Sequence, residues 1–344
     1  QRAKNIFLLN NGSTGVGFLR EKSRYIRQIS FSKIPSHNFQ EVIISQNIKK
    51  SVIKEPSINK TSEIIKKLKY ISKNGFSATS LRKYLSNPID FYSRYILEIP
   101  DYIPQTNTLN DMERGIIIHK TLEELYTPYL KKQMKIPYYD KILKKIKFTL
   151  HYYFKKYYGN KYDLTGENFL IISAYERAIR LFINKEKKLV IDNNRIFILD
   201  IEKDFKVNLN SKNEVFLKGK IDRLDKFNDV YRVIDYKTGY MNPDYLKYTS
   251  DFQRFKGDYK LHNQFQLLIY LLALKIDGEK VENFQAGVIS LHSPLTAVIP
   301  LKNKSAPKNK GDNSLDPYIL DEFHEFLKSV ILEIFDKKKS FVSL

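Results

Sequence analysis

The feature that most constrains this chain is the stretch from Lys218 to Gly239, which reads KGKIDRLDKFNDVYRVIDYKTG. Its alternating side chains predict two short strands joined by a tight turn at Asn228-Asp229. If that turn has two residues, Phe227 pairs with Val230, and this pairing sets the register of every other position in the hairpin.

Two carboxylates fall opposite one another in this register. Asp222 faces Asp235 on one side of the hairpin, and Lys237 lies one step further along. Two like charges this close repel, so the pair destabilises the fold unless a cation lies between them. A divalent metal ion is the usual cation in such a site. A shift of one residue would place the aspartates on opposite faces, so the functional interpretation depends on the turn.

The charge of the chain favours an anionic partner. Lysine and arginine number 59 against 38 aspartates and glutamates, which gives a formal net charge of +21. Such an imbalance favours nucleic acid first. A coding bias toward lysine, isoleucine, asparagine and tyrosine is the alternative and explains part of the excess. The hydrophobic fraction of 42% supports a packed core, and 344 residues allow one large domain or two smaller ones.

The chain contains no cysteine, which excludes disulfides, thiolate zinc sites and iron–sulfur clusters built from these residues. No apolar run approaches the ~20 residues of a membrane helix. The opening sequence, which runs from Gln1 into NIFLLNNG, does not resemble a signal peptide. We therefore expect a cytoplasmic protein without a membrane partner, and a sequence that begins inside a longer protein.

The N-terminal part differs in composition from the rest. Residues 5–9 and 41–45 are predicted strands, separated by Ser/Gly/Asn-rich loops and the basic segment REKSRYIRQ. Residues 51–75 are rich in lysine, serine and asparagine and indicate a linker with one amphipathic helix around Ser62–Ile71. The predicted division is a tail of an upstream region over 1–50, a linker over 51–75, and one domain over 76–344 with its core at about 113–291.

The first half of the predicted domain is helical. Two helical stretches over 76–97 are separated by Asn87-Pro88. Another helix opens at Gly115 and places His119 beside its buried apolar stripe. Further helices are predicted over 131–162 and 166–192.

The second half supplies the strands. A strand over 196–209 carries Glu202 and precedes the hairpin, and the apolar segment HNQFQLLIYLLALKI after it predicts a buried helix. Gln266 and Tyr270 lie on one face of that helix. A strand over 283–291 and a helix at about 317–335 complete the chain, and this order predicts an α/β core.

The segment over 131–162 interleaves lysine with tyrosine, as in KKIKFTLHYYFKKYYGNKY. A solvated amphipathic helix accounts for most of its lysines. The same mixture of basic and aromatic side chains also suits a surface that follows a nucleic-acid backbone and stacks bases.

Each polar residue in these elements is a weak signal alone, because a histidine beside an apolar stripe is more often a core residue than a ligand. Their order along the chain is the stronger signal, and it resembles the RecB/AddB-type nuclease branch of the PD-(D/E)XK superfamily over roughly 76–341. The matching residues are Gly115 and His119, Glu202, Gly219 and Asp222, Asp235 and Lys237, and Gln266 and Tyr270.

The resemblance implies an α/β fold with a restriction-endonuclease-like core, in which helices flank a mixed central sheet and N-terminal and helical segments are added. It implies a Mg²⁺- or Mn²⁺-dependent deoxyribonuclease, an exonuclease acting in DNA end resection and recombinational repair. The opening segment looks like the end of the helicase-like region of AddB-like proteins. The implied partners are DNA and a helicase-type subunit or upstream region. A catalytically silent DNA-binding scaffold and an endonuclease are the alternatives.

The family pattern also implies a metal site. Asp222 and Asp235 are expected to be catalytic and to hold one or two Mg²⁺ or Mn²⁺ ions together with the backbone carbonyl of Tyr236. His119 is the further ligand in this pattern, and its imidazole favours tolerance of Mn²⁺.

The remaining matching residues are expected to act around the metal. Lys237 is expected to be catalytic and to orient the attacking water or to stabilise the charged transition state. Glu202 is also assigned as catalytic, and is expected to hold a metal-bound water or to support a ligand from the neighbouring strand. Gln266, Tyr270 and Arg223 are expected to bind DNA or to brace the site.

One position departs from the family pattern. Asn87, in YLSNP, stands where AddB-type nucleases carry the first of four cysteines that hold a [4Fe–4S] cluster, and no cysteine follows in this sequence. We therefore predict that the protein binds no iron–sulfur cluster.

Overall fold

The computed structural model describes residues 5–8, 23–32, 38–40, 42, 56–102, 107–210, 214–280, 284–292, 298–304, 315–316 and 318–343. The chain divides into two compact units, Gln1–Lys54 and Glu55–Leu344. Within the first unit, α1 (Arg24–Phe31) forms in the basic segment. The strand predicted over 5–9 is not found at residues 5–8, and 41–45 lies outside the described residues except for residue 42.

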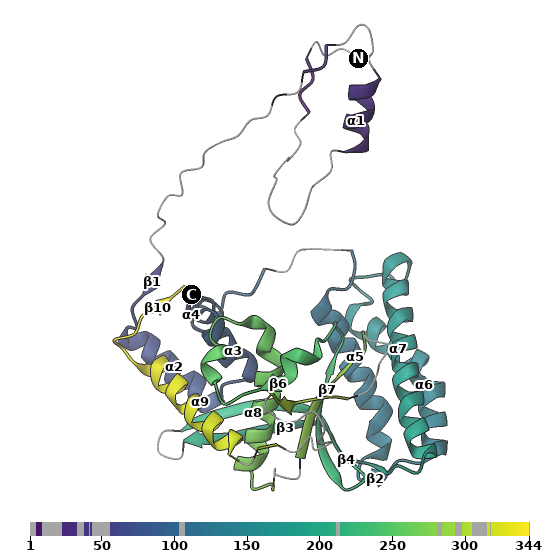
Figure 1. The fold of residues 1–344 in the computed structure, drawn as a ribbon, viewed down its shortest axis with the longest axis vertical. Helices are drawn as coiled ribbons and strands as arrows, with labels where there is room; N and C mark the ends of the chain where they lie inside the picture. Colours follow the sequence, from purple (N-terminus) through teal and green to yellow (C-terminus); the bar gives the residue numbers. More distant parts are fainter. Residues whose placement is uncertain are drawn as a thin grey trace. The chain divides into compact units, whose positions relative to one another are not determined.

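A six-stranded mixed sheet forms the centre of the second unit (Figure 1). Its order is β2-β3-β4-β5-β7-β8, in which β5 and β7 run parallel and the other neighbours run antiparallel. The predicted mixed sheet is therefore confirmed. The strands are β2 (Lys132–Gln133), β3 (Ile196–Asn210), β4 (Val215–Phe227), β5 (Val230–Lys237), β7 (Phe284–Ser290) and β8 (Ile299–Pro300).

Three helices pack together on one side of this sheet: α5 (Asp111–Tyr126), α6 (Ile136–Tyr158) and α7 (Gly166–Ile191). Their apolar stripes share a core cluster with Ile234 and Tyr236 of β5. The helix predicted to open at Gly115 begins earlier, because Asn110 and Glu113 form a capping box at its N-terminus. Gly115 therefore lies inside α5, one turn before His119.

The other side of the sheet carries a second core cluster, centred on the apolar helix α8 (His262–Ile276). The further helices of this cluster are α2 (Ser62–Asn74), α3 (Ala78–Ser86), α4 (Pro88–Phe91), a π-helix (Tyr92–Ile96) and α9 (Ile319–Phe335). Leu68 of α2 is fully buried in it. The linker predicted over 51–75 is therefore wrong from residue 55 onward, because its amphipathic helix packs into the core.

Short elements complete the unit. Those paired in two-stranded sheets are β1 (Ser57–Ile58) with β10 (Phe341–Val342) and β6 (Lys247–Tyr248) with β9 (Lys302–Asn303). The 3-10 turns are Thr127–Tyr129, Pro243–Leu246, Phe252–Phe255 and Tyr259–Leu261. Asn87 caps α4, since its side chain accepts a hydrogen bond from the Ile89 amide at 3.1 Å.

The central hairpin forms with the predicted two-residue turn. Phe227 pairs with Val230, and the pairing runs to Arg223 opposite Ile234. Asn228 adopts a φ of 54°, a left-handed conformation that asparagine tolerates in hairpin turns.

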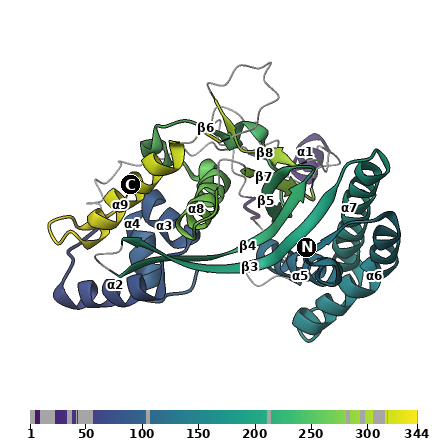
Figure 2. The same cartoon turned by 90° about the horizontal axis from the view of Figure 1, so that it is seen from below.

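The two strands of the hairpin separate just beyond this ladder. β4 continues along β3 to Val215, whereas β5 continues along β7 to Lys237. Figure 2 shows β3 and β4 as a long curved pair of strands that extends toward α2 and α3. Asp222 and Asp235 are the first residues past the last described pair, one on each diverging strand. The predicted direct pair of aspartates is therefore replaced by a split that begins at these two residues.

None of the described helices is both long enough and apolar enough to cross a membrane. The cytoplasmic location stays a prediction.

Candidate active site

The split between β4 and β5 brings together residues from both sides of the sheet. His119 reaches it from α5, and Gln266 and Tyr270 reach it from α8. Since α5 and α8 belong to different core clusters, only a gap in the sheet allows their side chains to meet at one place.

His119 lies among oxygen atoms. Its Nε2 is 3.0 Å from the carbonyl oxygen of Tyr236, and its Nδ1 is 3.4 Å from Oε1 of Glu202 and 3.5 Å from Oδ1 of Asp222. The other oxygen of Asp222 accepts a hydrogen bond from the Tyr236 amide at 2.7 Å. The backbone of Tyr236 thus fixes the carboxylate of Asp222 and presents its carbonyl to the same space.

Asp235 and Lys237 form the second half of the site. The Nζ of Lys237 lies 2.9 Å from Oδ2 of Asp235 and donates a hydrogen bond to Oε1 of Gln266 at 2.9 Å. Gln266 in turn donates to the hydroxyl of Tyr270. Asp235 is only 1% exposed, and its Oδ1 has no hydrogen-bond partner among the described residues.

The charges of the site are strongly coupled. Burial alone would lower the pKa of His119, but Asp222, Glu202 and Asp235 outweigh burial and raise this pKa to about 10. Burial, together with the neighbouring Asp222, raises the pKa of Asp235 against the opposing effect of Lys237. Burial also opposes the charge of Lys237, yet Asp235 and Asp222 hold the pKa of Lys237 above its usual value. Lys237 is therefore an ammonium ion at neutral pH.

The donor set fits a hard divalent cation. One ligand atom each of His119, Glu202 and Asp222 lies within 4.8 Å of the others, and the Tyr236 carbonyl lies 3.0 Å from His119. Asp235 is not a member of this group of three, but its charge interacts with those of Asp222 and His119. Several oxygens with one imidazole suit Mg²⁺ or Mn²⁺ rather than a thiolate-seeking metal.

Gly219 on β4, one of the residues that match the family pattern, leaves room for the ring of Phe205. A Cβ on Gly219 would lie 2.7 Å from the ring of Phe205 on β3, and Phe205 packs edge-to-face on Tyr270 at 6.0 Å. Tyr270 holds Gln266, which binds Lys237. A chain of contacts thus runs from Gly219 to the lysine of the site.

Arg223 was expected to bind DNA or to brace the site, and its burial favours bracing. Its side chain is 0% exposed, so this conformation excludes direct contact with DNA and leaves the bracing role. Arg223 pairs with Glu186 of α7 at 2.8 Å and with Asp225 at 2.6 Å. It also donates to the hydroxyl of Tyr236 at 3.3 Å, whose backbone holds Asp222.

Three supporting residues were not identified from the sequence: Glu186, Phe205 and Tyr126, whose ring lies 4.8 Å from the Arg223 guanidinium. For Glu186 a signal existed, because it continues the buried stripe of Ile179, Phe182 and Ile183 on α7. An acid at an apolar position needs a buried partner. We find no comparable signal for Phe205 or Tyr126.

Comparison with known proteins gives two matches. The family model for the PD-(D/E)XK nuclease superfamily matches residues 75–340. The chain is also 25% identical over 246 residues to a subunit of the ATP-dependent helicase/deoxyribonuclease of Clostridium perfringens (strain SM101 / Type A). That alignment covers 66% of this chain and 20% of the relative, so the match extends over about a fifth of the relative's length.

Proposed function

Because the chain belongs to the PD-(D/E)XK nuclease superfamily, we propose that it hydrolyses phosphodiester bonds of DNA at the split between β4 and β5. The observation that carries this proposal is the convergence of Asp222, Asp235 and Lys237 with His119 where the two strands separate. A module that only binds DNA does not need a buried aspartate that pairs with a lysine through one carboxylate oxygen and leaves the other without a hydrogen-bond partner.

The metal ion would be held by Asp222, Asp235, His119 and the Tyr236 carbonyl. When bound, Mg²⁺ or Mn²⁺ would lower the pKa of the attacking water. It would also neutralise negative charge on the phosphate and on the leaving oxygen. The Tyr236 amide fixes Asp222 for this role.

Lys237 would act on the substrate directly. As an ammonium ion held between Asp235 and Gln266, it can orient the attacking water and stabilise negative charge that develops on the phosphate. Tyr270 holds Gln266 in place, so we assign both residues to bracing Lys237. Glu202, beside His119, supports the metal site from β3.

We further propose exonuclease action in DNA end resection, with a helicase-type partner or upstream region. The relative is named as a helicase/deoxyribonuclease subunit, which supports the helicase-type partner, and the exonuclease action is what the order of the site residues along the chain implies by its resemblance to RecB/AddB-type nucleases. A catalytically silent scaffold and an endonuclease are the competing functions. Linear and circular DNA incubated with Mg²⁺ or Mn²⁺ separates them: no cleavage indicates a scaffold, loss of linear DNA alone an exonuclease, and cut circles an endonuclease.

Substitution of the central residues tests the proposal. Asp235→Ala and Lys237→Ala are each expected to lower metal-dependent DNA cleavage by about 100-fold or more, with circular dichroism showing an intact fold. Lys226→Ala is the matched control, because Lys226 lies in the same hairpin, away from the site. Cleavage that persists in either site variant contradicts the assignment.

A further inference from the structure

The helix α6 carries a basic and aromatic outward face. Residues three and four apart share one face of a helix, and seven exposed residues of α6 do so over a length of about 22 Å. We name these residues the α6 stripe: Lys141, Lys144, Lys145, Phe148, Tyr152, Lys155 and Lys156.

Two aromatic rings lie exposed in the middle of the α6 stripe. Phe148 is 74% exposed and Tyr152 is 46% exposed, while the opposite side of α6 packs Ile142 and Ile146 into the core. A face that only keeps the helix solvated needs lysines but no exposed aromatic rings. Their position between two groups of lysines points to a ligand with both negative charge and flat apolar surfaces.

The lysines of the α6 stripe are exposed to solvent. Among the described residues, none of its lysines forms an ion pair with a carboxylate. The one acidic residue of α6, Asp140, pairs instead with Lys187 of α7 at 2.6 Å. Uncompensated positive charge of this kind attracts the phosphates of a nucleic acid.

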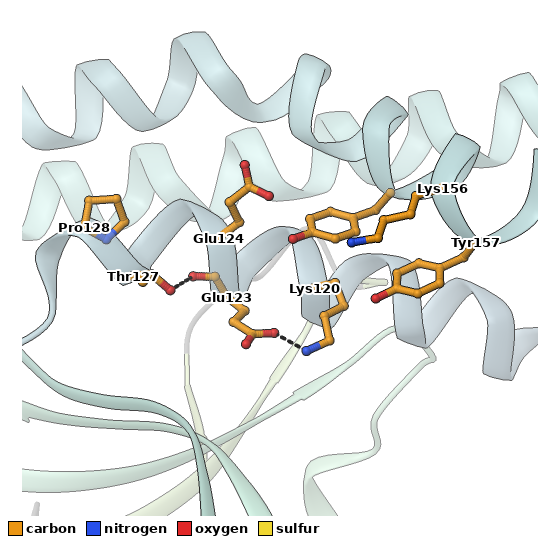
Figure 3. Close-up of a pocket in the computed structure, with 8 residues that line it drawn as sticks. Lys120, Glu123, Glu124, Thr127, Pro128, Lys156 and Tyr157 are labelled. Atoms are coloured by element: carbon orange, nitrogen blue, oxygen red, sulfur yellow. Dashed lines mark hydrogen bonds and ion pairs between the residues drawn. The ribbon is translucent and has the colours of Figure 1, made fainter.

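The C-terminal end of the α6 stripe reaches a groove whose lining includes the chain neighbour of His119. Lys156 and Tyr157 line a groove of about 430 Å³ between α5 and α6, together with Lys120, which directly follows His119 in the chain. Figure 3 shows Lys156 and Tyr157 on the side of the groove that faces Lys120. The Nζ of Lys156 lies 5.8 Å from the centroid of the Tyr157 ring.

The groove is connected to the site through Lys120. Lys120 lies on α5 directly after His119, and its Nζ hydrogen-bonds Glu123 in the lining of the groove. The negative charge of Glu123 in the groove is compensated by Lys120, whose Nζ lies 2.5 Å from the Glu123 carboxylate.

We propose that the α6 stripe binds single-stranded DNA and leads it through the α5–α6 groove to the active site. Its lysines contact phosphates, and Phe148 and Tyr152 stack on unpaired bases, whose faces are covered in a duplex. Binding by the stripe is independent of catalysis, whereas the destination of the strand rests on the proposed nuclease function.

A second helix of similar composition provides a matched control. Tyr70 of α2 is 67% exposed and lies among lysines, including Lys66 and Lys69. Figure 2 shows α2 at the end of the sheet remote from α6. If lysine-rich composition alone caused binding, the two helices would contribute equally.

Affinity is measured by fluorescence anisotropy of a labelled oligothymidine and of a duplex of equal length, in EDTA so that no cleavage occurs. Phe148→Ala/Tyr152→Ala is expected to weaken single-strand binding by about tenfold or more, and Tyr70→Ala by less than about twofold. Lys144→Ala/Lys145→Ala is expected to reduce the slope of log affinity against log salt by about 0.7 for each lysine–phosphate interaction that is removed.

Three results overturn the proposal: unchanged single-strand affinity in a folded Phe148→Ala/Tyr152→Ala protein, an equal loss for the duplex, or an equal loss in Tyr70→Ala. The nuclease proposal is tested separately by cleavage in Mn²⁺. If the stripe variant loses single-strand binding but the unmodified protein never cleaves DNA, the proposed role of the α6 stripe stands and the proposed nuclease function is wrong.

Discussion

Gly115 and Gly219 are suited to their positions for different structural reasons. Gly219 is required by close packing, because any side chain there collides with Phe205. A Cβ at Gly115 would have no neighbouring atom within 4 Å, although this glycine lies one turn before His119 on the same face of α5. We therefore interpret Gly115 as leaving space for substrate rather than for protein packing.

Substitution of Gly115 separates these two effects. Gly115→Ala is expected to raise the free energy of unfolding by about 0.5–1 kcal/mol, because alanine costs less backbone entropy inside a helix. Gly115→Leu is expected to fold as well but to lower DNA cleavage by about tenfold or more, since it displaces the substrate. Chemical denaturation and a cleavage assay measure the two quantities. Full cleavage by Gly115→Leu contradicts the interpretation.

The raised pKa of His119 gives metal binding a pH dependence. In the metal-free protein the charged imidazole stabilises the fold fully below about pH 6.5, and this contribution is lost as the pH rises through about 10. A metal ligand must be the neutral imidazole, so binding at pH 7 has to release the proton of His119.

Calorimetry of Mn²⁺ binding at pH 7 in two buffers with different ionisation enthalpies is expected to show release of about one proton per site. Apparent affinity is expected to rise with pH by up to about tenfold per unit below pH 10. His119→Asn is the control and should release markedly less. A binding enthalpy that is independent of the buffer would show that His119 is not a ligand.

Among the elements, β4, β5 and α7 are joined by a buried group of ions. Arg223 and Asp225 of β4, Arg232 of β5 and Glu186 of α7 pair with one another at 2.6–2.8 Å. The charges balance, and Arg223 of the cluster donates a hydrogen bond to the Tyr236 hydroxyl. The backbone of Tyr236 forms part of the proposed metal site. We infer that this cluster sets the position of β5 at the point where it leaves β4.

Removal of one member of this cluster tests its energetic role. Arg223→Met is expected to lower the free energy of unfolding by about 3–5 kcal/mol, because Glu186 and Asp225 would remain buried without their partner. Lys226→Met, on the same strand, removes an exposed ion pair and is expected to change it by less than about 1 kcal/mol. Urea denaturation of both variants decides the matter, and equal effects would show that the buried cluster has no special role.

Across the whole molecule, the boundary of the folded unit matters for any shortened protein. The second unit begins at Glu55, and α2 contributes Leu68 to its core. At the other end, Phe341 of β10 is fully buried against Phe91 and Tyr92. Both ends of this unit therefore belong to its core.

Two truncated chains distinguish this boundary from the one predicted at residue 76. Residues 55–344 are expected to unfold as cooperatively as the full chain. Residues 76–344 are expected to lose at least about 2–5 kcal/mol, because the site vacated by Leu68 alone is comparable to a large core truncation. Thermal unfolding followed by circular dichroism measures both. Equal unfolding midpoints for the two fragments would show that residues 55–75 act as a linker.

The absence of an iron–sulfur cluster is a prediction that concerns the whole protein. Asn87, at the position of the first expected cysteine ligand, caps α4 in the structure. Iron and sulfide analysis of the full-length protein tests the prediction, and stoichiometric iron would contradict it.

The sequence alone determined the local features of the site. The two-residue turn and the hairpin register follow from Asn228-Asp229 and the alternation around it, and the position of α8 follows from a strongly apolar segment. These features depend on neighbours in the chain, so a single sequence contains the information for them.

The tertiary structure decided where those features meet. The separation of β4 from β5 at Asp222 results from their pairing with β3 and β7, and the burial of Arg223 results from Glu186 on a distant helix. The packing of Leu68 likewise depends on elements far along the chain. Such contacts join segments remote in sequence, and their free energy depends on the assembled core rather than on any local pattern.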